Sequence, residues 1–176
     1  PFFFAYAKNK NARKTYADIM QYFVLFLVVG LLGIMANLDW LKYFINKSGD
    51  PEQQAVYWSG LVILPVLLFN YVLLGIYMNL SIWYKLTDQT RFGLYISLIG
   101  AVTTVILNIL LIPIYSYIGA ALSTTITYTI MASLSYFWGQ KYYPIPYPVR
   151  KISLYLIFGL AAAFVMQHVL HSDFWW

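Results

Sequence analysis

The chain has 176 residues, of which 61% are hydrophobic, 20% aromatic and only 10% charged, and its formal net charge is +5. Soluble domains are about half apolar and about a quarter charged, so this composition excludes an ordinary water-soluble globule. The absence of cysteine excludes disulfide frameworks, thiolate nucleophiles and cysteine metal sites. The basic residues stand in short loops between long apolar runs, which indicates a membrane protein and no nucleic-acid partner.

The first residues read as the end of something longer. The chain begins with Pro1 and an apolar, aromatic run, and it lacks the basic start and cleavage site of a signal peptide. We therefore expect the C-terminal portion of a longer protein. Residues 1–18 are predicted to be the cytoplasmic end of an earlier helix plus a basic loop.

Five stretches are long and apolar enough to cross a bilayer of about 30 Å as helices. They cover approximately residues 19–38, 57–84, 92–114, 117–138 and 152–170. None alternates polar and apolar residues as a transmembrane β-strand does. The sequence thus predicts an all-α, polytopic helical membrane protein whose residues 171–176 form a non-cytoplasmic tail.

Proline and aromatic residues add local expectations. Pro65 lies inside the second predicted span and should break its hydrogen-bond ladder near Leu61. The proline-rich segment 142–148 cannot remain helical and is predicted to be a stiff, extended linker. Aromatic rings at the span ends, Trp83 among them, are expected at the headgroup layer.

The charged loops predict an orientation. Nine of the eleven Lys and Arg residues fall in loops that share one side of the predicted topology. These loops lie near Lys8–Lys14, Lys85–Arg91 and Lys141–Lys151. The loops on the other side contain Lys42 and Lys47, which are offset by Asp39, Asp50 and Glu52. Because basic loops stay in the cytoplasm, the three basic loops are predicted to be cytoplasmic.

The middle of each predicted span contains no Asp, Glu, Lys, Arg or His, so the usual signature of an ion-coupling site is missing. Uncharged polar residues instead form stripes along the second, third and fourth spans. Such stripes either pack helices together or line a polar pathway, and the sequence leaves both interpretations open. The candidate pathway residues are Asn70, Tyr77, Thr104, Asn108 and Thr127.

Four basic residues are candidates for phosphate contacts at the cytoplasmic mouth: Lys85, Arg91, Arg150 and Lys151. The guanidinium fork of arginine suits phosphate. The alternative is that these residues only set the topology and contact anionic membrane lipids.

No metal, cofactor or catalytic group is expected. His168 and His171 are three residues apart, but no carboxylate or cysteine lies nearby to complete a metal site. The acidic and histidine residues form no spaced catalytic motif, so we do not expect an enzyme.

Several short motifs carry a resemblance to a known family. They are Trp83-Tyr-Lys-Leu-Thr-Asp-Gln-Thr-Arg-Phe-Gly93, Ser97-Leu-Ile-Gly-Ala101, Leu107-Asn-Ile-Leu-Leu-Ile-Pro113 and Gly119-Ala-Ala121. In this order they resemble the polysaccharide-biosynthesis flippases of bacteria, which export O-antigen and capsule repeat units. These flippases belong to the multidrug/oligosaccharidyl-lipid/polysaccharide exporter superfamily. The similarity extends from Phe2 to about Phe164, and residues 139–147 resemble the linker of relatives from Bacteroidetes.

The resemblance implies part of the second lobe of a two-lobe transporter in the bacterial inner membrane. Its implied cargo is a polyprenyl-diphosphate-linked oligosaccharide, and its implied partner is a first lobe of the same chain. Two alternatives remain: export of drugs or small metabolites within the same superfamily, and a non-transporting membrane scaffold.

Overall fold

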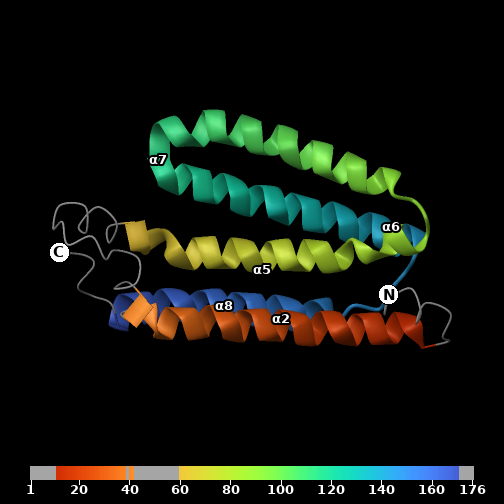
Figure 1. The fold of residues 1–176 in the computed structure, drawn as a ribbon, viewed down its shortest axis with the longest axis horizontal. Coiled ribbons are helices and arrows are strands. Elements are labelled where there is room, and N and C mark those ends of the chain that lie inside the picture. Colours follow the sequence, from red (N-terminus) through yellow and green to blue (C-terminus); the bar gives the residue numbers. More distant parts are fainter. Residues whose placement is uncertain (1–10, 39, 42–59, 171–176) are drawn as a thin grey trace.

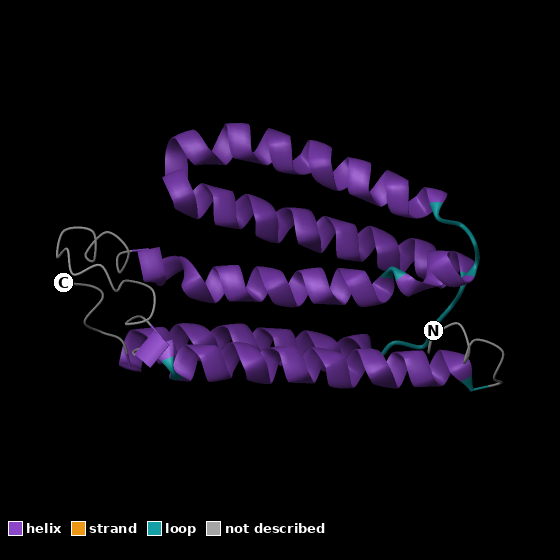
Figure 2. Cartoon of the chain, in the orientation of Figure 1, coloured by secondary structure: helices purple, strands orange, loops and turns teal. Residues whose placement is uncertain are grey.

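The computed structural model describes residues 11–38, 40–41 and 60–170, and this part contains helices and no strand (Figures 1 and 2). The elements are α2 (Ala12–Ala36), the 3-10 turn η1 (Gly60–Ile63), α5 (Leu64–Leu80), α6 (Ile82–Leu86), α7 (Arg91–Tyr142) and α8 (Val149–Leu170). The predicted loop residues Lys8, Lys10, Asp39, Lys42, Lys47, Asp50 and Glu52, as well as His171 and the 171–176 tail, lie outside the described residues.

The described part contains four helical stretches that are long and apolar enough to cross a membrane. They are Ala12–Ala36, Gly60–Leu86, Arg91–Tyr142 and Val149–Val169. Large apolar side chains such as Phe26, Ile109 and Phe158 are about 70% exposed on the outside of the bundle. Such a surface is stable against lipid chains, which confirms the predicted all-α membrane fold.

The third and fourth predicted spans form one continuous element, α7. Its two arms, residues 91–115 and 117–142, fold back on each other at Ser116 (Figure 1). Ser116 turns the chain with φ 52° and ψ −132°, a conformation that favours glycine. Close packing at the turn depends on Gly119, where a Cβ atom would lie 2.6 Å from the carbonyl carbon of Leu111.

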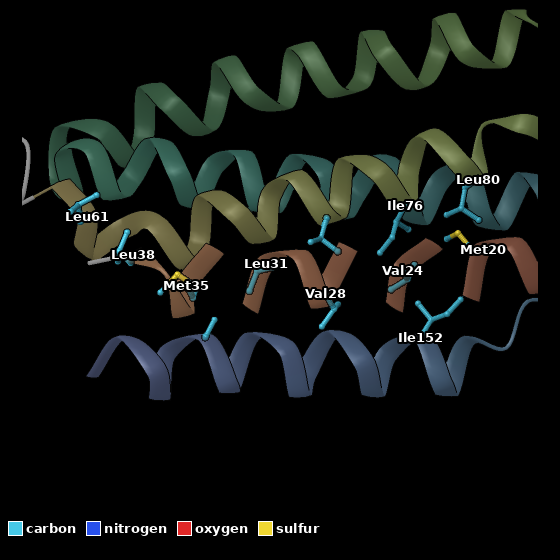
Figure 3. Packing of buried hydrophobic residues seen from close by; sticks show 12 residues of the cluster. Met20, Val24, Val28, Leu31, Met35, Leu38, Leu61, Ile76, Leu80 and Ile152 are labelled. Atoms are coloured by element: carbon cyan, nitrogen blue, oxygen red, sulfur yellow. The ribbon is translucent and has the colours of Figure 1, made fainter. Parts of the chain in front are cut away.

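Helix α5 lies between the α7 hairpin on one side and the α2–α8 pair on the other (Figure 1). The core is a stripe on α2 that recurs every three or four residues, as helical periodicity requires. Met20, Val24 and Val28 belong to this stripe, which meets apolar residues of α5 and α8 (Figure 3). Helix α8 approaches closely because it presents Gly159, where a Cβ atom would lie 2.6 Å from Val28 Cγ1.

The predicted break near Pro65 takes a specific form. The second span begins with the 3-10 turn η1, and Pro65 occupies the first turn of α5, where its missing N–H is best tolerated. Pro65 cannot donate to the carbonyl of Leu61, four residues earlier. The buried side chain of Gln167 on α8 donates to that carbonyl instead, with Nε2 3.0 Å from the oxygen.

The role of the Gln167 side chain as the donor to the Leu61 carbonyl can be tested. Gln167→Leu should lower the free energy of unfolding by about 1–2 kcal/mol, because a buried carbonyl loses a partner. In a Pro65→Ala background the new N–H of residue 65 can donate to the Leu61 carbonyl. Gln167→Leu should therefore lower the free energy of unfolding by less in that background. Denaturation by SDS in mixed micelles, followed by circular dichroism, measures both. An equal cost in the two backgrounds would contradict this account of Pro65.

Candidate functional site

Asn70 lies in the interface between α5 and the second arm of α7 and is 4% exposed. Its Nδ2 donates to the carbonyl of Ala121 over 3.1 Å, and its Oδ1 accepts from Thr125 Oγ1 over 2.6 Å. Thr125 Oγ1 also lies 2.9 Å from the same Ala121 carbonyl. The three residues therefore form a closed polar contact that ties α5 to α7.

A second set of polar contacts joins the two arms of α7. The hydroxyls of Thr104 and Thr127 lie 3.1 Å apart, and Thr104 also donates to the Gly100 carbonyl over 2.9 Å. Closer to the turn, Ser123 donates to Asn108 Oδ1. The hydroxyl stripe of the second arm thus pairs with the polar stripe of the first.

The structure brings four of the five candidate pathway residues into these helix–helix contacts: Asn70, Thr104, Asn108 and Thr127. Tyr77 lies elsewhere, in an apolar cluster with Trp83 and Met131. Interhelical hydrogen bonds between small polar residues are a common way to hold membrane helices together. The four residues have this packing role here, and their part in a transport pathway stays a prediction.

A cleft of about 250 Å³ opens beside Asn70 on the outer side of the α5–α7 interface. Its walls include the tyrosines Tyr71, Tyr117 and Tyr128, of which Tyr71 is 71% exposed. Tyr117 directly follows the turn residue Ser116, so the cleft lies toward the hairpin end of the bundle. The cleft thus brings three tyrosines and the buried Asn70 together at this end of the bundle.

All described lysines and arginines lie at the opposite end of the bundle, which we call the basic end (Figure 1). They stand at the starts of α2, α7 and α8 and at the ends of α6 and α7. They are Arg13, Lys14, Lys85, Arg91, Lys141, Arg150 and Lys151. The four candidate phosphate contacts among them are all exposed. Within the described residues, the hairpin end contains no lysine or arginine.

The basic end also contains a cleft that the sequence did not reveal. It has a volume of about 460 Å³ and lies between the start of α2 and the linker, with Arg13, Lys14 and Gln140 in its walls. The Arg13 guanidinium lies 4.8 Å from the centre of the Tyr143 ring, which favours a cation–π contact. The sequence suggested that Arg13 and Tyr143 lie close together only because the predicted topology places their two loops on the same side of the membrane.

The linker between α7 and α8 is non-helical from Tyr143 to Pro148. It is anchored by Ile145, which is 1% exposed and whose carbonyl accepts from Gln140 Nε2 over 2.7 Å. Burial, and secondarily the neighbouring Tyr143, raises the pKa of Tyr147. The phenol of Tyr147 therefore stays protonated at physiological pH.

Trp83 corrects an expectation from the sequence. It is 1% exposed, so its ring is enclosed by other parts of the protein and is not open to lipid headgroups. Its Nε1 donates to the carbonyl of Ser135 over 3.0 Å, and its ring packs on Gly139, where a Cβ atom would lie 2.9 Å from Trp83 Cδ1. The physical reason is that Gly139 leaves room on α7 for the indole, while a backbone carbonyl satisfies its N–H.

Within the described residues, no group of three His, Cys, Asp or Glu side chains is placed to hold a metal ion. The expectation that the protein needs no metal or cofactor stays a prediction.

The coupling between Asn70 and Thr125 can be measured with a double-mutant cycle. Asn70→Leu and Thr125→Val should show a coupling free energy of about 0.6–1.7 kcal/mol, the range of interhelical bonds in membranes. Unfolding in mixed micelles gives the four stabilities. Asn79→Leu is the matched control, because Asn79 follows Asn70 by two and a half helical turns and so lies on the opposite face of α5. It should show no coupling to Thr125. Equal coupling for Asn70 and Asn79 would contradict the assigned contact.

The comparison with known proteins agrees with the geometry. The MatE family matches residues 5–110, which include α2, α5, α6 and most of the first arm of α7. No curated protein and no solved structure matches the chain. The family match covers more than half of the chain and confirms the superfamily that the sequence motifs resemble. The chain belongs to the MatE family, whose members are membrane transporters of the multidrug/oligosaccharidyl-lipid/polysaccharide exporter superfamily.

Proposed function

We propose that the chain belongs to a flippase that moves a polyprenyl-diphosphate-linked oligosaccharide across the bacterial inner membrane for O-antigen or capsule export. The observation that carries the proposal is the basic end, where all seven described lysines and arginines gather and outnumber the two described carboxylates, Asp18 and Asp88. A diphosphate headgroup is anionic and favours such a surface. The basic end then faces the cytoplasm, where lipid-linked repeat units await export.

The physical task fits a transporter of this family. A charged headgroup cannot cross hydrocarbon unaided, and a polar passage between two lobes removes most of that cost. In this proposal the described helices act with a first lobe of the same protein. Arg91 and Arg150 receive the diphosphate at the cytoplasmic mouth, because their planar forks bind phosphate oxygens in pairs.

A second candidate is the export of organic cations. The cleft beside Asn70 presents three tyrosines, and aromatic faces attract cations. This cleft lies at the hairpin end, away from the basic residues. Deletion of the gene distinguishes the two candidates: loss of surface polysaccharide supports the flippase, while increased drug sensitivity with normal polysaccharide supports cation export.

The role of the arginines can be separated from their effect on topology. Arg91→Lys combined with Arg150→Lys keeps the positive charge that orients the helices, but it removes both guanidinium forks. Surface polysaccharide should fall by about thirtyfold, since the two lost bidentate contacts cost roughly 1 kcal/mol each, or about 2 kcal/mol together. Arg13→Lys is the control at the same end of the bundle and should leave export unchanged.

Polysaccharide is measured by gel analysis of surface extracts at matched protein levels. Full export by the double variant would contradict the phosphate-contact role of Arg91 and Arg150. Unchanged export after gene deletion would contradict the proposed function as a whole.

A further inference from the structure

A lateral groove of about 390 Å³ runs between α2, α5, α8 and the second arm of α7. Its floor is apolar and buried, and consists of residues such as Met20, Leu80 and Ile152, which come together from three helices (Figure 3). Its mouth is exposed and includes Phe137, Ser133 and Ser153. None of the residues that line it is charged.

The groove is nearly as long as one leaflet of the hydrocarbon core is deep. It extends on α7 from Thr129 to Phe137 and on α8 from Val149 to Leu156. At 1.5 Å per residue these segments span about 10–12 Å, which approaches the depth of one half of a hydrocarbon core of about 30 Å. The groove therefore reaches from the basic end to near the middle of the membrane.

Cationic side chains stand where a lipid headgroup would lie. Lys141 follows the groove residue Phe137 by four positions on α7, and Arg150 precedes the groove residue Ser153 by three on α8, so each continues the groove face by one turn. Both are exposed. Side chains on a helix tilt toward its N-terminus, so Arg150 reaches toward the basic end.

Tyr147 closes the groove at the same end, between these two cations in the chain. Its phenol stays protonated, as shown above, and can donate a hydrogen bond to a phosphate or ester oxygen. Along the walls, Ser133 already donates to the Thr129 carbonyl over 2.7 Å. The interior of the groove is thus apolar, while its end presents donors and positive charge.

We propose that this groove binds one anionic phospholipid of the adjacent leaflet, with an acyl chain along the floor and the phosphate between Lys141 and Arg150. The apolar walls match a hydrocarbon chain, which restores the dispersion contacts that an unfilled groove would lack. The headgroup supplies the selectivity, because the rim is basic and no carboxylate lines the groove. The groove contains none of the candidate pathway residues. Its rim shares Arg150 with the proposed cargo contact, but lipid binding in the groove does not depend on which cargo is carried.

The test uses the full chain reconstituted in vesicles that contain phosphatidylglycerol and phosphatidylcholine. The protein is released in mild detergent, and its bound lipid is identified by native mass spectrometry. The wild type should retain one phosphatidylglycerol. Ser133→Phe, which places a ring across the mouth, should lose it, whereas Ala101→Phe, at an exposed position on the first arm of α7, should keep it.

A second pair of variants tests the rim without altering the groove. Arg150→Gln should lower retention by about fivefold, since a cation near an anionic headgroup contributes about 1 kcal/mol. Lys14→Gln removes the same charge at the same end, away from the groove, and should retain the lipid. Equal retention of phosphatidylcholine, full retention by Ser133→Phe, or a second protein chain in place of the lipid would overturn the proposal.

Discussion

Inside a bilayer every polar group has to find its partner within the protein, and the packing of this chain follows from that constraint. Pro65 has no N–H to donate to the carbonyl of Leu61, and this carbonyl accepts a hydrogen bond from the Gln167 side chain of α8 instead. The amide of Asn70 meets a carbonyl and a hydroxyl of α7. Each of these polar contacts links two helices. The same hydrogen bonds that give buried polar groups a partner therefore also hold the bundle together.

The positions of the positively charged side chains follow from the same constraint, because a bilayer interior offers them no partner. The described lysines and arginines avoid the apolar lengths of the helices and collect at the basic end, where α6 meets α7 and the linker leads into α8. The opposite end has a tight hairpin turn at Ser116 and no described lysine or arginine. This asymmetry gives the bundle two chemically distinct ends. The proposed cargo and the proposed lipid both depend on the positive one.

Helix positions and the common side of the basic loops could be predicted from sequence, because hydropathy and loop charge are local properties. The partners of Asn70, Thr104 and Asn108 could not, since a polar stripe suits a pathway as well as a helix contact. The burial of Trp83 was missed for a related reason. Its position at a span end suggests the interface, and only the space above Gly139 on a distant part of the chain explains its burial.

The orientation of the two ends is the claim on which the account rests, and the chain suits its measurement because it contains no cysteine. Ser116→Cys at the hairpin and Thr90→Cys at the basic end each introduce a unique thiol. A membrane-impermeant maleimide should label Ser116→Cys in intact spheroplasts and Thr90→Cys only after lysis. Labelling of Thr90→Cys in intact spheroplasts, with Ser116→Cys protected, would contradict the cytoplasmic placement of the basic end.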